Sequence, residues 1–298
     1  MSGLGTVVVG FDGSPSSHDA LALGARLAQA GGAALVAAFV YRADLVPLGD
    51  ESEFEDWQRS IALRELGAAS ALQPSAELAA VRARSVARGL HELAGERDAS
   101  VVVVGGTHRG AIGRVVPGST AQRLLEGAPC PVAVAPRGWG ATDVSLAPVV
   151  AGFDGEEDSR VAVAWAGRVA ALLEAPLRLV TVVEPLPPLP RDPVTFVRPD
   201  ALEQMMADAR ESLRGSLRSE LDTLAAGLAE SAPGVPVDVQ LLDGHPADRL
   251  VAQADGEGGL IVVGSRGYGP LGAVLVGSVA AEVLREATSP VIVVPRSA

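Results

Sequence analysis

The sequence of 298 residues has no lysine, no asparagine and one cysteine, and only 3% of its residues are aromatic. A single cysteine, Cys130, excludes an internal disulfide and any metal site built from several cysteines. The absence of lysine excludes a phosphate-binding loop of the Gly-Lys-Ser/Thr type. Hydrophobic residues still make up 48% of the chain. The cores must therefore be built mainly from Ala, Val and Leu.

Positive charge is also scarce, since 24 arginines face 36 acidic residues and the formal net charge is −12. A protein that binds nucleic acid usually presents a basic surface. An anionic membrane would repel a chain of this charge. We therefore expect neither nucleic acid nor a membrane as a partner.

Long apolar runs are missing as well. The longest uncharged apolar stretch, around residues 31–41, is far shorter than the ~20 residues that span a bilayer. Residues 1–6 contain no basic side chain and lead into only three valines, which is too short for the core of a secretory signal. We expect a soluble, cytoplasmic protein.

The two halves of the chain repeat one another. The segment VVGFDG at 8–13 recurs as VAGFDG at 150–155, a shift of 142 (154 − 12), and Gly118-Ser119 recurs as Gly277-Ser278, a shift of 159 (277 − 118). The two shifts differ by 17 residues (159 − 142), which indicates an insertion in the middle of the second copy. We predict a first domain over 1–138, a linker over 139–146 and a second domain over 147–298.

Within each copy, strand-like and helix-like patterns alternate. The first copy has predicted strands at 6–10, 35–40, 81–83, 101–104 and 132–135. Four helices are predicted between them: one that starts at Ser14, one that ends near Leu72, one that includes 90–94 and one over 119–126. A polar, acidic stretch over 44–56 precedes the second of these helices. In the second copy the strands are expected near 149 and at 177–183, 235–241, 260–263 and 291–294. This alternation is typical of an α/β domain whose parallel sheet is covered by helices on both faces.

A glycine-rich turn follows the fourth predicted strand. In the second copy it reads Gly264-Ser265-Arg266-Gly267. After nine intervening residues, Gly277-Ser278 opens the next helix. Glycine permits close backbone approach, and a helix N-terminus offers unpaired N–H groups and partial positive charge. The turn can therefore hold a phosphate, or it can simply make a tight connection from strand to helix. Spacing alone leaves both interpretations open.

The pattern Gly264-x2-Gly267-x9-Gly277-Ser278 resembles the ATP-binding signature of the universal stress proteins. The Asp-Gly turn after the first strand and the closing Pro-Val-x-Val-x-Pro strand resemble the same family, and the likeness covers nearly the whole chain. It implies two tandem doubly wound domains, each with a five-stranded parallel sheet of order 3-2-1-4-5. Ligands of such sheets bind at the switch point between strands one and four.

The same resemblance implies which residues bind nucleotide. In the second domain, Asp154 and the backbone of Val182 would meet adenine, and the chain would pass close to the nucleoside at Gly244. The ribose and phosphates would be held by Gly264, Gly267, Gly277 and Ser278. The corresponding first-domain residues are Asp12, Val40, Gly105, His108, Gly118 and Ser119. The implied ligand is ATP, with or without Mg²⁺, or a related adenine nucleotide.

The family also suggests how the halves assemble. Its last strands commonly pair across a pseudo-two-fold, so residues 131–136 and 290–295 would join the two domains as an intramolecular pseudo-dimer. Association of whole chains into a homodimer would be a further step.

Each copy departs from the signature at one position. His108 stands where the second copy has Gly267, and its imidazole would block the phosphates or, when protonated, pair with them. Glu156 stands where the first copy has Ser14. It would repel a triphosphate if it pointed inward and favour the helix start if it pointed outward, and we favour the outward case. Because its glycines are intact, the second copy is the better candidate for ATP.

We predict a sensor or regulator of the stress response that binds adenine nucleotide and is not an enzyme. No catalytic residue is assigned, because no base is arranged near the glycines. No metal site is assigned, because the four histidines lack ligand spacing. Slow ATP hydrolysis and a nucleotide-free interaction module are the alternatives. Cys130 aligns with Ser289 and is expected to be a small buried residue and not a nucleophile.

Overall fold

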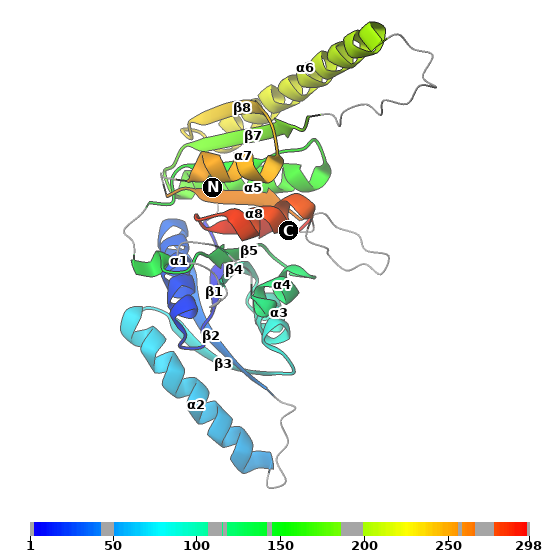
Figure 1. Ribbon diagram of the computed structural model, residues 1–298. Helices are drawn as coiled ribbons and strands as arrows, with labels where there is room; N and C mark the ends of the chain where they lie inside the picture. The colour runs from blue at the N-terminus through cyan, green and yellow to red at the C-terminus, as the bar shows by residue number, and fades with distance from the viewer. Residues whose placement is uncertain are drawn as a thin grey trace.

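A computed structural model of the chain describes residues 3–42, 51–106, 115, 118–141, 145–185, 199–255, 258–265 and 277–296. Its strands form one 10-stranded sheet of order β3-β2-β1-β4-β5-β10-β9-β6-β7-β8, which runs through the length of the molecule (Figure 1). Each half of this sheet has the order 3-2-1-4-5. The predicted fold of two tandem doubly wound α/β domains is confirmed.

The first half contains β1 (Thr6–Gly10), α1 (Pro15–Gly31), β2 (Ala34–Arg42), α2 (Glu51–Leu72), β3 (Glu77–Ala83), α3 (Val86–Glu96), β4 (Ala99–Gly105), α4 (Ser119–Leu125) and β5 (Val132–Ala135). A short 3-10 helix, η1 (Trp139–Ala141), follows. The second half contains β6 (Val149–Gly152), α5 (Glu157–Leu172), β7 (Leu177–Val183), α6 (Pro199–Ser231), β8 (Val237–Asp243), α7 (Pro246–Ala254), β9 (Leu260–Gly264), α8 (Ser278–Glu286) and β10 (Val291–Val294).

The two halves meet at an antiparallel pair of strands. Within each half the neighbouring strands are parallel, whereas β5 and β10 run in opposite directions, with Ala133 opposite Ile292. This is the pairing of last strands that the family resemblance implied. It joins the two domains into one continuous sheet.

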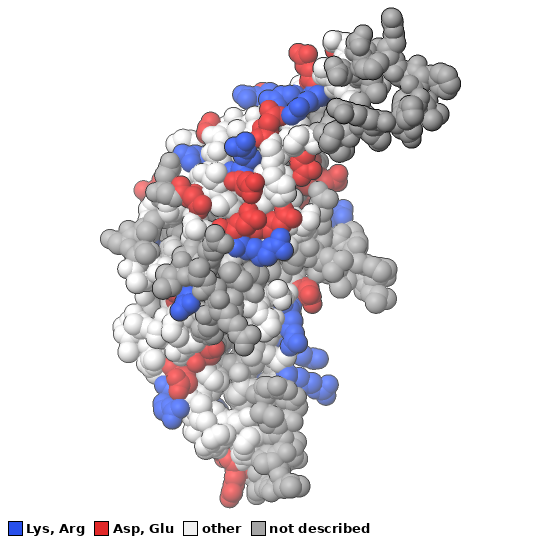
Figure 2. Space-filling model, viewed as in Figure 1, with Lys and Arg blue, Asp and Glu red and all other residues white. Residues whose placement is uncertain are grey.

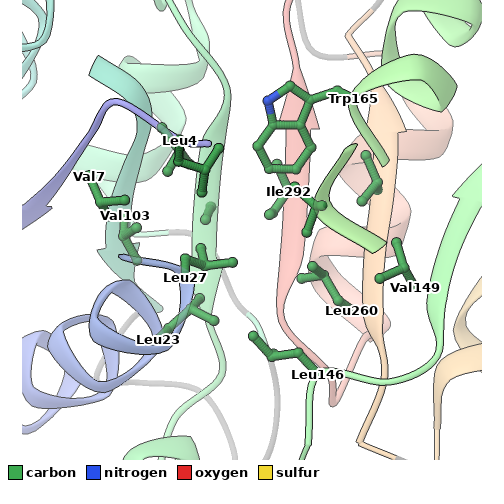
Figure 3. Close-up of a cluster of buried hydrophobic side chains, with 14 of the residues drawn as sticks. Leu4, Val7, Leu23, Leu27, Val103, Leu146, Val149, Trp165, Leu260 and Ile292 are labelled. Atoms are coloured by element: carbon green, nitrogen blue, oxygen red, sulfur yellow. The ribbon is translucent and has the colours of Figure 1, made fainter. Parts of the chain in front are cut away.

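Both faces of the sheet are buried. Alternate residues of β1 enter different cores: Val7 and Val9 belong to the cluster under α1, α2, α5 and α6, and Val8 belongs to the cluster under α3, α4, α7 and α8. The first cluster continues across the seam, where Leu4 faces Ile292 and Trp165 (Figure 3). Because a strand buried on both faces needs apolar residues at every position, the sequence shows runs of valine and not alternation.

Several boundaries differ by a few residues from those predicted, and α2 and β3 show why. Helix α2 begins at Glu51, inside the acidic stretch expected to precede it, because carboxylates are favourable in the first turn of a helix. Strand β3 begins at Glu77 and not at Val81. It is an edge strand whose exposed positions obscure the pattern, and its length follows from its pairing with β2 over seven residues.

The insertion in the second copy lengthens one helix. Helix α6 has 33 residues and its counterpart α2 has 22, so α6 accounts for 11 (33 − 22) of the 17 extra residues. Its first part projects beyond the sheet (Figure 1). Basic side chains gather where α6 meets β8 (Figure 2), and two of them, Arg210 and Arg214, contact Asp243 at 2.6 and 2.9 Å. None of the helices that the structure describes is long and apolar enough to cross a membrane.

Candidate functional site

The Asp-Gly turn has the same construction in both halves. The Asp154 carboxylate accepts a hydrogen bond from the amide of Glu156 at 3.1 Å, and Gly155 adopts φ +91°. In the first half, Asp12 accepts from the amide of Ser14 at 3.0 Å. A carboxylate that binds the amide two residues later fixes a tight turn, and glycine allows the left-handed conformation. Each turn directs the chain from the first strand of its half into the following helix.

The glycine that ends the fourth strand is required by a close approach of two backbones. A Cβ atom on Gly105 would lie 2.1 Å from the carbonyl oxygen of Ser16, and one on Gly264 would lie 2.7 Å from that of Asp158. Both distances are shorter than any van der Waals contact. The fourth strand can therefore run against the start of α1 or α5 only because it ends in glycine.

These turns surround a pocket at the carboxyl ends of the strands of the second half. Its volume is about 410 Å³. The lining comes from the ends of β6, β7 and β9 and from the starts of α5, α7 and α8: Gly152, Phe153, Asp154, Glu156, Asp158, Ser159, Val180, Val182, Glu184, Pro246, Leu250, Val263, Gly264, Gly277, Ser278, Val279 and Ala280. We call it the second pocket. It lies at the switch point between the first and fourth strands of that half, where open α/β sheets bind ligands.

The first half contains the equivalent pocket, of about 330 Å³. It is lined from β1, β2 and β4 and from the starts of α1, α3 and α4, by Gly10, Phe11, Asp12, Ser14, Ser16, Ser17, Ala38, Val40, Val86, Leu90, Val104, Gly105, Gly106, Gly118, Ser119, Thr120 and Ala121. We call it the first pocket. The two halves thus share an equivalent pocket as well as an equivalent fold.

Most of the predicted nucleotide-binding residues come together in these pockets. Asp154, Val182, Gly264, Gly277 and Ser278 line the second, and Asp12, Val40, Gly105, Gly118 and Ser119 line the first. Gly267 and His108 lie outside the described residues.

Gly244 is placed beside the second pocket but is not in its lining. It has φ +134°, and a Cβ on it would lie 2.7 Å from Nε of Arg249. The Arg249 guanidinium donates to the carbonyl oxygen of Asp243 at 2.8 Å. The glycine is thus needed for the turn into α7, whose first residue, Pro246, does line the pocket.

Three acidic residues of the second pocket were not assigned to it from the sequence. Glu156, for which we favoured an outward orientation, is exposed but belongs to the lining, as does the exposed Glu184. The Asp158 carboxylate is 15% exposed and lies 3.4 Å from Nε of Arg296. The shift of 142 residues could have revealed two of them, since it aligns Glu156 with Ser14 and Asp158 with Ser16.

A larger hollow of about 510 Å³ lies elsewhere, where the linker crosses α1. The buried Asp19 carboxylate beside it accepts hydrogen bonds from the amides of Gly138 and Gly140 at 2.7 and 2.8 Å. Because these bonds fasten the linker to α1, the polar group at this hollow has a structural role. The two pockets at the strand ends are the better candidates for a ligand site.

Cys130 is buried, and this burial raises the pKa of its thiol from 9.0 to about 11. A thiol with so high a pKa is almost entirely protonated at neutral pH, and the thiolate is the nucleophilic form. This agrees with its alignment with Ser289 and with a structural role.

Comparison with known proteins identifies the class to which this protein belongs. The profile of the universal stress protein family matches residues 3–136 and 146–295. The chain belongs to this family and is of its tandem type, with two such domains over nearly its full length.

Individual relatives have the same extent. A universal stress protein of Mycobacterium tuberculosis is 32% identical over 306 residues, which cover 98% of this chain and 97% of the relative. A second one from that organism is 28% identical over 308 residues, covering 97% and 99%. Among solved structures, a universal stress protein from Archaeoglobus fulgidus superposes with a TM-score of 0.69 and 19% identity, covering 98% of each chain. That structure supports the fold alone.

Proposed function

We propose that this tandem universal stress protein binds ATP or a related adenine nucleotide in its two strand-end pockets and acts as a sensor or regulator of the stress response. The observation that carries the proposal is the pair of equivalent pockets, each bounded by the Asp-Gly turn, by the end of the second strand and by a glycine that opens a helix.

The second pocket has suitable chemistry for each part of a nucleotide. Apolar side chains such as Val182 and Leu250 line one side, and such surfaces suit a flat base. Gly277 caps the N-terminus of α8 without any side-chain hydrogen bond to the cap. The free amide groups of that helix end can therefore bind phosphate oxygens together with the hydroxyl of Ser278. We propose ATP as the ligand, with Mg²⁺ accompanying it in solution.

The proposal is tested by calorimetric titration of Mg·ATP into the nucleotide-stripped full chain. The matched variants are Ser278→Glu and Ser119→Glu. Both serines are exposed first residues of a helix, where a carboxylate does not disturb the helix but repels phosphate. Ser219→Glu, at an exposed position in the middle of α6, adds the same charge away from both pockets.

We expect wild type and Ser219→Glu to bind ATP alike and each pocket variant to lose binding at its own site. If the wild-type chain binds no adenine nucleotide at all, the proposal is wrong and the protein is a nucleotide-free interaction module. Release of phosphate during the same incubation, abolished by Ser278→Glu or Ser119→Glu, would instead identify a slow ATP hydrolase.

A further inference from the structure

The two pockets occupy equivalent positions in their halves but differ in charge. Among the described lining residues, the second contains four carboxylates, Asp154, Glu156, Asp158 and Glu184, whereas the first contains one, Asp12. Within that described part of each lining there is no arginine. For two of the three additional carboxylates the difference arises at aligned lining positions, since a shift of 142 residues places Glu156 on Ser14 and Asp158 on Ser16. The same shift places the third, Glu184, on Arg42.

Two of the four carboxylates in the second pocket, Glu156 and Glu184, form no ion pair with any residue that the structure describes. Glu156 caps α5 without a side-chain hydrogen bond to the helix, and Glu184 is exposed just after β7. Asp158 differs, because Arg296 lies 3.4 Å from its carboxylate and compensates it. Asp154 has its counterpart Asp12 in the first pocket. Glu156 and Glu184 are therefore the charges that distinguish the second pocket from the first.

Hydroxyl groups occupy the corresponding region of the first pocket. The Ser14 Oγ accepts from the amide of Ser17 at 3.3 Å, and the Ser17 hydroxyl donates to the carbonyl oxygen of Ser14 at 2.8 Å. Ser119 and Thr120 add two more hydroxyls to the lining. Neutral donors can approach phosphate oxygens without electrostatic cost, whereas a carboxylate within several ångströms repels each phosphate charge.

We propose that the two pockets differ in selectivity: the first binds the highly charged triphosphate more tightly, and the second binds ATP more weakly and prefers an uncharged adenine ligand such as adenosine. This inference rests on the proposed function and specifies the ligand class of each site. The glycine spacing favoured the second pocket as the ATP site, whereas this inference favours the first. A chain with two such sites would report the ratio of charged to uncharged adenine compounds.

The test uses the full chain labelled with ¹³C in the valine methyl groups. Val40 lines the first pocket and Val182 the second, so their signals report occupancy of each site separately. ATP and adenosine are titrated in turn into wild type, into Glu156→Ser with Glu184→Gln, and into Ser14→Glu. Glu157→Ser is the control, because Glu157 is an exposed neighbour on α5 that is not in the lining.

We expect the ratio of ATP to adenosine affinity to be at least about tenfold lower at Val182 than at Val40, as expected for two uncompensated charges near a triphosphate. The double variant should raise ATP affinity at Val182 and leave adenosine affinity unchanged. Ser14→Glu should lower ATP affinity at Val40, Glu157→Ser should change neither, and high salt should reduce all these differences.

Equal ratios at the two pockets, or ratios that the charge variants leave unchanged, would overturn the inference while the proposed function stood. If neither adenosine nor ATP shifted either valine, the proposed function itself would fail, and the inference with it. Thermal unfolding of each variant, measured alongside, separates lost affinity from lost structure.

Discussion

Gly105 and Gly264 show how a residue without a side chain can determine the position of a site. The close backbone approach at Gly105, where a Cβ would lie 2.1 Å from the Ser16 carbonyl oxygen, brings the end of β4 against the start of α1. We expect Gly105→Ala to lower the free energy of unfolding by about 1–3 kcal/mol, as overpacking does. Unfolding of the variant and of the wild type by denaturant measures this difference in free energy.

Gly67 provides the control for this prediction. It is exposed within α2, and a Cβ there would have no heavy atom within 4 Å. Gly67→Ala should stabilise the protein by about 0.5–1 kcal/mol through helix propensity. Equal stability of the Gly105→Ala variant and wild type would contradict the proposed packing.

Because its thiol is buried, Cys130 makes the free energy of unfolding depend on pH in the alkaline range. Its folded-state pKa of about 11 lies above the ordinary value of 9.0 because burial disfavours the thiolate. A raised pKa means that the folded state holds the proton more tightly than the unfolded state does. The resulting stabilisation is complete below about pH 9, is lost as the pH rises towards 11, and is on the order of 2–3 kcal/mol.

Substitution by serine, the residue at the aligned position Ser289, tests this dependence. We expect the wild-type protein to lose unfolding free energy between about pH 9 and 11 and Cys130→Ser to lose much less over the same interval. Parallel curves for the two proteins would show that the thiol does not titrate as described.

At the scale of single elements, two partly exposed ion pairs connect the N-terminal half of α6 to the end of β8. Arg210 and Arg214 bind the Asp243 carboxylate at the end of β8, and the Arg210 hydrogen bond is the main cause that holds the pKa of this carboxyl below its ordinary value. We expect Asp243→Asn to speed hydrogen exchange of the α6 amides around residues 204–218. Added salt should speed exchange in the wild type as well, because these contacts are exposed.

Asp238→Asn is the matched control for this helix. Asp238 lies on the same strand and accepts a hydrogen bond only from the neighbouring Gln240 among the described contacts, at 2.7 Å. Exchange in α6 should be unchanged in that variant. Unchanged exchange in Asp243→Asn would mean that apolar contacts alone hold the helix.

At the scale of the whole molecule, the two domains form one unit. Strand β5 pairs with β10, and one core cluster continues across the seam. The amide of the buried Val115 donates to the carbonyl oxygen of Ala287 at the end of α8, at 2.8 Å. That bond connects a residue of the first half to the helix that begins at the second pocket.

We expect the two halves to stay associated when the connecting chain is cut. A protease site introduced at 142–144 should be cleaved without separating the halves, because the shared sheet and core remain. Size-exclusion chromatography of the cleaved protein should show one species of about the intact mass, 30.3 kDa. Elution as two half-sized species would contradict the joint core.

The sequence predicted what depends on local patterns and on the repeat. The Asp-Gly turns and the runs of valine are local features, and their recurrence in the sequence indicates two domains. The strand order came from the family resemblance. Contacts between residues far apart in the sequence could not be foreseen: Asp158 with Arg296, Asp19 with the linker amides, and Val115 with Ala287. The alignment of the two copies places Glu156 beside the second pocket, whereas the compensation of Asp158 by Arg296 is known only from the structure.

The most direct test of the central claim is a crystal structure of nucleotide-stripped protein soaked with ATP and with adenosine. The account predicts adenine density beside the Asp-Gly turns, at Asp12 and Asp154, with the phosphates directed towards the helices that begin at Ser119 and Ser278. Density confined to another place, such as the hollow beside Asp19, or no ligand density at high soaking concentration, would contradict it.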